Sequence, residues 1–275
     1  MMIRHLCLAL SVCLGLGASS PICSASDVSH QTVEGVPYAL IGEAPPQPAP
    51  TLVLLAADRE TTLTDPNFCR GARKLRDEAG FLIVGIDMPA HGDDVRPGEK
   101  TGLPGWAQRI GRQEDVVAPF VQRVKTVIDH LIRTGRSDPG RIALFGISRG
   151  GFMSLQVMAA DPRIAAAITL SPVTDLAALS EFTGMETNPL VRSTALVHLA
   201  PALAGRPVWI SIGNRDRRVD TDRCIAFTRA VVAATPPEVK LVPLHLLVLP
   251  TDNHRQTDQA HEQAAAWLLA RFSRR

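Results

Sequence analysis

The sequence has few of the residues that build metal centres or disulfide frameworks. It contains five cysteines and eight histidines in 275 residues, and none of them cluster at the spacing of metal ligands. We therefore expect no metal site and no cofactor. Cys7, Cys13 and Cys23 lie close to the N-terminus. The other two, Cys69 and Cys224, could form one disulfide in an oxidising compartment, although we favour two separate buried thiols.

Concentrated charge is also missing. The formal net charge is +2, and the basic residues are scattered along the chain. A protein that binds a polyanion normally has a concentrated basic face, so we expect no nucleic-acid partner. The chain has no internal repeat, and its 45% apolar and 20% charged residues are ordinary for a soluble globular protein.

Only the N-terminus carries an extended apolar segment. Arg4 and His5 precede an apolar stretch over residues 6–16, and small residues follow up to Ala25. This layout predicts a secretory signal peptide over residues 1–25, and hence a periplasmic or secreted protein. The stretch is shorter than the roughly 20 apolar residues of a membrane span, so we expect no stable membrane insertion after cleavage. An uncleaved anchor or a buried helix is the alternative.

Past this leader, short apolar strands alternate with amphipathic helices. The predicted strands cover residues 36–41, 51–56, 82–87, 141–145, 164–170, 208–212 and 241–249. The predicted helices cover residues 68–79, 113–134, 151–160, 222–234 and 258–272. This alternation predicts one α/β domain over residues 26–275, with a mainly parallel central sheet covered by helices on both faces. Residues 171–206 lack the alternation, and we interpret them as a small cap over the strand ends.

A glycine-rich turn follows the strand at 141–145. Residues 146–151 read Gly-Ile-Ser-Arg-Gly-Gly, which is the G-x-S-x-G pattern in the strand–turn–helix setting that it requires. The glycines permit a tight turn against neighbouring chain, where a Cβ would clash. Ser148 would then stand clear of the sheet at a helix start, where the N–H of Arg149 can stabilise an oxyanion. Ser148 is therefore the candidate nucleophile, and an ordinary serine in a glycine-rich connection is the alternative.

A serine nucleophile needs a base and a third group that orients the base. When such a turn carries the serine, the acid and then the histidine follow along the chain. Asp216 lies directly after the strand at 208–212, and Val219 can pack against the core to hold its turn. Asp220 and Asp222 are alternatives, but they are more typical of helix N-caps.

The histidine is expected after the last strand. His254 lies between the strand at 241–249 and the last helix, which makes it the candidate base. His261 falls inside that helix, and His198 and His245 precede the loop. Each of the three candidates thus follows a predicted strand, at the edge where functional residues gather in parallel α/β sheets.

These features together resemble the α/β-hydrolase superfamily, over nearly the whole chain past the leader. Three stretches are similar to its dienelactone-hydrolase and prolyl-oligopeptidase-like branch: residues 146–152, residues 207–219, and the Asp-Met-Pro-Ala-His-Gly segment at 87–92. The resemblance implies a single α/β-hydrolase domain. It also implies a catalytic triad of Ser148, Asp216 and His254.

One loop departs from the pattern of that branch. The strand that ends at Ala56 is usually followed by His-Gly, and here it is followed by Ala57, Asp58 and Arg59. We expect the second oxyanion N–H to come from Asp58 or Arg59. A carboxylate beside an oxyanion is unfavourable unless neutralised, so we also expect Asp58 to pair with Arg149 or Arg59.

The predicted activity is hydrolysis of a small-molecule carboxylic ester through an acyl-enzyme on Ser148. A small secreted serine peptidase of the prolyl-oligopeptidase-like type is one alternative, and a non-catalytic binding protein on a hydrolase scaffold is another. The side chain of Arg149 could face the cleft and attract an acidic or phosphate-bearing ligand. A solvated or internally paired arginine is the interpretation that we favour.

Overall fold

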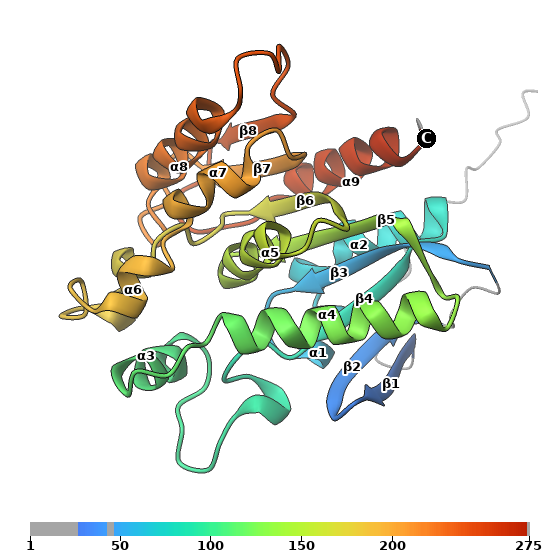
Figure 1. The fold of residues 1–275 in the computed structure, drawn as a ribbon, viewed down its shortest axis with the longest axis horizontal. Coiled ribbons are helices and arrows are strands. Elements are labelled where there is room, and N and C mark those ends of the chain that lie inside the picture. The colour runs from blue at the N-terminus through green and yellow to red at the C-terminus, as the bar shows by residue number, and fades with distance from the viewer. Residues whose placement is uncertain (1–26, 43–46, 274–275) are drawn as a thin grey trace, which may run out of the picture.

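The computed structural model describes residues 27–42 and 47–273 (Figure 1). The predicted signal peptide lies outside the described residues. Within them, no helix combines the length and the apolar character needed to cross a membrane.

An eight-stranded sheet forms the centre of the fold, with the strand order β1-β2-β4-β3-β5-β6-β7-β8. The strands are β1 (Val28–Val33), β2 (Val36–Ile41), β3 (Ala49–Leu55), β4 (Leu82–Ile86), β5 (Ser137–Ile147), β6 (Ile164–Leu170), β7 (Val208–Gly213) and β8 (Leu244–Leu249). β2 pairs antiparallel with β1 and with β4, and all other pairs are parallel. The predicted mainly parallel sheet is therefore confirmed.

Helices cover both faces of the sheet. The main ones are α1 (Arg59–Thr64), α2 (Pro66–Ala79), α3 (Leu103–Gly111), α4 (Ala118–Arg133), α5 (Arg149–Ala160), α8 (Thr221–Ala234) and α9 (Asp258–Phe272). Because side chains alternate along a strand, Val53 and Leu55 of β3 pack into a core cluster with α4, α5 and α8, whereas Leu52 and Leu54 pack into a second cluster with α2 and α9. Figure 1 shows α4 and α5 on the near face.

The structure differs from the sequence expectation in several helical and strand segments. β1 was not predicted because it is polar, which suits an edge strand beside β2. The helix expected at 113–134 begins only at Ala118. The Asp115 carboxylate accepts hydrogen bonds from the N–H groups of Val117 and Ala118, and so satisfies two amide groups at the start of the helix. The helices α1 and α3 were also not predicted, and α1 changes the loop after β3.

Residues 171–206 form short helical turns rather than a strand–helix unit. They contain α6 (Pro189–Ser193), α7 (Ala200–Leu203) and three 3₁₀ turns. Figure 1 shows α6 beyond the ends of the central strands, on the same side as α3. Leu176, Phe182 and Val191 are buried in the same cluster as α5, so the segment packs directly on the domain.

Cys69 and Cys224 lie on opposite faces of the sheet. Cys69 of α2 is buried in the cluster with α9, and Cys224 of α8 is buried in the cluster with α4 and α5. They form no disulfide with each other, so the favoured interpretation of separate buried thiols is confirmed. Burial raises the pKa of the Cys224 thiol to about 12, which suits a structural residue.

Candidate active site

Ser148 occupies a strained turn between β5 and α5. Its backbone angles are φ 55° and ψ −114°, a region that residues with a Cβ rarely adopt. Two hydrogen bonds hold the turn: the Ser148 N–H donates to the Leu170 carbonyl at 2.9 Å, and the Ser148 carbonyl accepts from the Val173 N–H at 3.1 Å. The end of β6 and the chain that follows it therefore hold the serine in place.

The flanking glycines are required by close contacts. A Cβ at Gly146 would lie 2.4 Å from Ser154 Oγ, and one at Gly150 would lie 1.7 Å from the Leu55 carbonyl oxygen at the end of β3. The second contact is with main chain, which cannot rotate away as a flexible side chain can. The turn can therefore approach β3 only without a side chain at position 150.

Gly150→Ala is expected to destabilise the protein by about 3 kcal/mol, because the new Cβ forces α5 away from β3. Gly111→Ala is the matched control: Gly111 is exposed in α3 with no atom within 4 Å of the added Cβ, so its stability should change by no more than about 1 kcal/mol. Urea unfolding of both variants measures the difference. Equal stabilities would contradict the steric role of Gly150.

The structure brings Ser148, His254 and Asp216 into one hydrogen-bonded line. His254 Nε2 lies 3.0 Å from Ser148 Oγ, and His254 Nδ1 lies 2.7 Å from Asp216 Oδ2. The other oxygen of Asp216, Oδ1, accepts the N–H groups of Arg218 at 2.9 Å and Val219 at 3.1 Å. The contacts match those needed for a serine activated by an oriented histidine.

The carboxylate of Asp216 is buried but remains suited to carry a negative charge. Burial alone would raise the pKa of this carboxyl group. The hydrogen bond and charge of His254 and the two N–H donors oppose burial, and the net result is a pKa below the ordinary value. Val219 is buried in the core, as predicted, and it anchors the turn that supplies these donors.

Neighbouring strands place the acid and the base next to each other. β7 and β8 are adjacent and parallel, so the loops after them emerge at the same edge of the sheet. The Asn214 N–H donates to the Leu249 carbonyl at 2.7 Å, and the Thr251 N–H donates to Asn214 Oδ1 at 3.2 Å. These contacts fix one loop against the other.

The alternative acids and bases have other roles in the structure. The Asp220 carboxylate caps α8 by accepting the N–H groups of Asp222 and Arg223, and Asp222 lies in the first turn of that helix. His261 is buried in α9, where its Nε2 lies 3.1 Å from the Asn67 carbonyl and burial lowers its pKa to about 4. None of these residues contacts Ser148.

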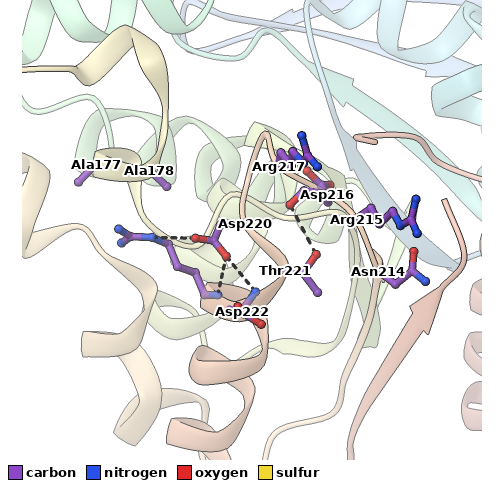
Figure 2. A pocket seen from close by; sticks show the side chains of 10 residues that line it. Ala177, Ala178, Asn214, Arg215, Asp216, Arg217, Asp220, Thr221 and Asp222 are labelled. Atoms are coloured by element: carbon purple, nitrogen blue, oxygen red, sulfur yellow. Dashed lines mark hydrogen bonds and ion pairs between the residues drawn. The ribbon is translucent and has the colours of Figure 1, made fainter. Parts of the chain in front are cut away.

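A separate depression of about 960 Å³ is also lined by the Asp216 turn. Figure 2 shows that its lining comes from the turn after β7, the start of α8 and two alanines at 177 and 178. Neither Ser148 nor His254 lines it. The reacting groups therefore face a different cavity.

The loop after β3 corrects two sequence expectations. The Arg59 N–H donates to Asp87 Oδ1 at 2.7 Å, so the prediction of Arg59 as an oxyanion donor was wrong. Among the described residues Asp58 also forms no ion pair with Arg59 or Arg149. Instead, Asp58 Oδ1 accepts the Thr61 N–H at 2.8 Å, because α1 begins here and its first amides lack partners within the helix.

Because the Asp58 carboxylate caps α1, its negative charge is balanced by the helix start and needs no arginine partner. Burial acts to raise the pKa of Asp58, but the hydrogen bonds from Thr61 outweigh it and the pKa lies below the ordinary value. The charge is thus stabilised by the start of α1. Arg59 pairs instead with Asp87 and, at 2.7 Å, with Asp93. Asp87 belongs to the segment at 87–92, so that segment holds the loop after β3.

Residues 106–274 match the prolyl oligopeptidase family. The chain belongs to that family. The matched range includes the nucleophile turn and both loops that carry Asp216 and His254, and the predicted resemblance to this branch of the α/β-hydrolases is confirmed.

Relatives of this prolyl oligopeptidase family member include two curated proteins. Hydrolyase poxO of Penicillium oxalicum is 28% identical over 99 residues, which are 36% of this chain. The acylamino-acid-releasing enzyme of Arabidopsis thaliana is 24% identical over 175 residues, which are 55% of this chain. The chain spans 21% of the length of each relative.

Solved structures share the fold at low sequence identity. A Thermus thermophilus protein has a TM-score of 0.66 and 18% identity, covering 88% of this chain and 96% of its own. A cold-adapted esterase from an Arctic intertidal metagenomic library has a TM-score of 0.64 and 20% identity, covering 89% and 92%. An acylaminoacyl peptidase of Pyrococcus horikoshii has a TM-score of 0.63 and 14% identity, covering 87% and 39%.

A cleft of about 210 Å³ opens at the serine of this family member. Ser148, Arg149 and His254 line it together with apolar side chains. Six further lining residues were not predicted as site residues from the sequence: Ala56, Phe68, Leu103, Ile147, Arg218 and Gln256. Arg218 and Gln256 each lie two residues after a predicted triad member, and this proximity in sequence could have indicated that they line the cleft. Phe68 and Leu103 lie in the first turns of α2 and α3, far away in sequence, and no local pattern marks them.

Proposed function

We propose that the protein hydrolyses small carboxylic esters through an acyl-enzyme on Ser148. The observation that carries the proposal is the line from Ser148 through His254 to Asp216 inside a cleft. The cleft of about 210 Å³ is smaller than the sites of drug-sized ligands, which supports short acyl groups. The similarity to a cold-adapted esterase over 92% of that chain supports an ester substrate.

In the proposed mechanism, His254 Nε2 takes the proton from Ser148 Oγ as this oxygen attacks the ester carbonyl. The N–H of Arg149, at the start of α5, and the N–H of Asp58 stabilise the oxyanion that forms. Asp216 keeps the proton of His254 on Nδ1 and stabilises the imidazolium. His254 then protonates the leaving alcohol, and the acyl group remains on Ser148.

The second half of the reaction releases the acid. A water molecule loses a proton to His254 Nε2 and attacks the acyl carbonyl. When the oxyanion collapses, the bond to Ser148 Oγ breaks and His254 returns the proton to that oxygen. The enzyme is restored, and no cofactor takes part in the proposed steps.

A substrate panel on the purified protein tests the proposal. We expect hydrolysis of p-nitrophenyl acetate and butyrate, slower hydrolysis of the octanoate, and covalent labelling by a fluorophosphonate probe. Faster cleavage of dipeptide p-nitroanilides than of the esters would instead indicate a peptidase. Failure to label and to turn over any ester would indicate a non-catalytic binding protein on the same scaffold.

We also propose that the protein is exported to the periplasm or secreted. The support is the sequence pattern of residues 1–25, with its basic start, apolar stretch and small residues. N-terminal sequencing of the protein from cell fractions tests this. Recovery of a cytoplasmic protein that retains the leader would contradict it.

A further inference from the structure

We infer that Arg149 selects substrates that carry a carboxylate close to the scissile ester, by pairing its guanidinium with that carboxylate. This inference rests on the proposed ester hydrolysis, and it adds a substrate class. Arg149 directly follows the nucleophile, and it lines the same cleft as Ser148 and His254. A carboxylate on a bound ester would therefore lie within reach of the guanidinium.

The guanidinium of Arg149 has no hydrogen-bond or ion-pair partner among the described residues. Its Nε is buried and unpartnered, although the residue as a whole is partly exposed, so of the two expected forms only the internally paired arginine is contradicted. Arg59 is also partly exposed with an unpartnered Nε, but its Nη atoms pair with Asp87 and Asp93, and the buried Arg109 pairs with Glu99 and Asp94. Arg149 lacks such a carboxylate partner among the described residues, and a ligand that supplied one could pair with its guanidinium.

The two carboxylates whose charge acts on Arg149 bind other groups. Glu181 and Asp58 both act on Arg149 through their charge. Glu181, however, binds Arg218 through both of its oxygens, at 2.8 and 2.5 Å, and Asp58 caps α1. The pair of Glu181 with Arg218 neutralises the second cation of the cleft and leaves Arg149 without an ion-pair partner among the described residues.

A second donor in the cleft also lacks an acceptor. The side-chain Nε2 of Gln256 is buried without a hydrogen-bond partner, and Gln256 lines the cleft with Arg149. Two unpartnered N–H donors in one cavity match the acceptor oxygens of a carboxylate. The apolar walls formed by Phe68 and Leu103 lower the local dielectric and so strengthen such a pair.

Burial has a direct electrostatic effect on Arg149. It lowers the pKa of the guanidinium, and the charge of Arg218 lowers it further. Both effects oppose the charged form, which remains protonated at neutral pH because arginine starts from a very high pKa. A substrate carboxylate beside the guanidinium would stabilise the charged form of Arg149 and so raise its pKa again.

Two pairs of esters, each differing by one charge, test the inference. Mono-p-nitrophenyl adipate is compared with its methyl ester, which places the carboxylate in the acyl part. 4-(Butyryloxy)benzoate is compared with its methyl ester, which places it in the alcohol part. The readout is the ratio of kcat/KM for the anionic ester to that for the neutral one, after subtraction of the rate with Ser148→Ala. Since the backbone N–H of Arg149 acts on both esters, the ratio isolates its side chain.

We expect a ratio well above one for at least one pair in the unmodified protein. Arg149→Gln should lower that ratio by about tenfold to a hundredfold, Arg149→Lys should lower it less, and the isosteric Gln256→Glu should lower it by repulsion. Arg229→Gln, which removes a charge on the exposed face of α8, should leave the ratio unchanged.

The outcomes separate this inference from the proposed function. A ratio of one or less for both pairs in the unmodified protein overturns the inference while the ester hydrolase stands, and this result needs no variant to fold. An unchanged ratio in Arg149→Gln also overturns it. Hydrolysis of p-nitrophenyl acetate but of none of the four esters overturns the inference alone, and failure to hydrolyse any of these esters overturns the proposed function and the inference with it.

Discussion

Ser148→Ala is expected to lower kcat for p-nitrophenyl butyrate by about 10⁴- to 10⁶-fold. The alanine removes the oxygen that attacks the carbonyl and leaves His254 Nε2 without its partner at 3.0 Å. The fold should survive, because the hydrogen bonds that hold this turn come from the backbone of residue 148. Steady-state kinetics and a thermal melt of the same preparation measure both effects.

The matched control for this substitution is Ser154→Ala. Ser154 lies on α5, in the same helix that the nucleophile precedes, and its Oγ is buried without a hydrogen-bond partner. Removing this hydroxyl should change kcat by less than about threefold, since a side chain with no partner loses no hydrogen bond. Ester hydrolysis by Ser148→Ala at more than a few per cent of the original rate would show that another group is the nucleophile.

Asp216→Asn is expected to lower kcat by about 10³- to 10⁴-fold. The amide oxygen of asparagine can still accept the N–H groups of Arg218 and Val219, which leaves its amide N–H₂ facing His254 Nδ1. His254 would then carry its proton on Nε2, the nitrogen that must accept the proton of Ser148. The imidazolium would also lose its negatively charged partner.

Asp220→Asn is the control, with the same chemical change four residues along the chain. Asp220 caps α8, and asparagine is an equally good N-cap, so stability and kcat should both remain close to those of the unmodified protein. Kinetics of the two variants at pH 7 measure the contrast. Equal activity of Asp216→Asn and Asp220→Asn would remove Asp216 from the mechanism.

The nucleophile turn was predictable because it depends on a short segment. A strand, two glycines around a serine and a helix are all visible within about 25 residues, and the structure shows why position 150 has no side chain. Asp216 and His254 were found by a different rule. The loops that follow parallel strands lie at one edge of the sheet. The position of Asp216 and His254 after their strands was therefore enough to predict both residues.

The loop after β3 was harder to predict because its contacts join distant segments. Arg59 was expected to donate its N–H to an oxyanion, and the structure gives that N–H to Asp87, which lies 28 residues away. Asp58 was expected to pair with an arginine, and it caps a helix that the sequence pattern did not predict. A helix of six residues is too short to show an amphipathic repeat.

The sequence by itself determined the α/β class, the identity of Ser148 and the two loops that carry its partners. Those features follow from local patterns of apolar residues and glycines and from the geometry of parallel strands. Only the tertiary structure decided which charges are paired in the cleft. Pairing depends on distances of a few ångströms between segments far apart in the chain, and these distances leave Glu181 on Arg218 and leave Arg149 beside Ser148 with no partner among the described residues.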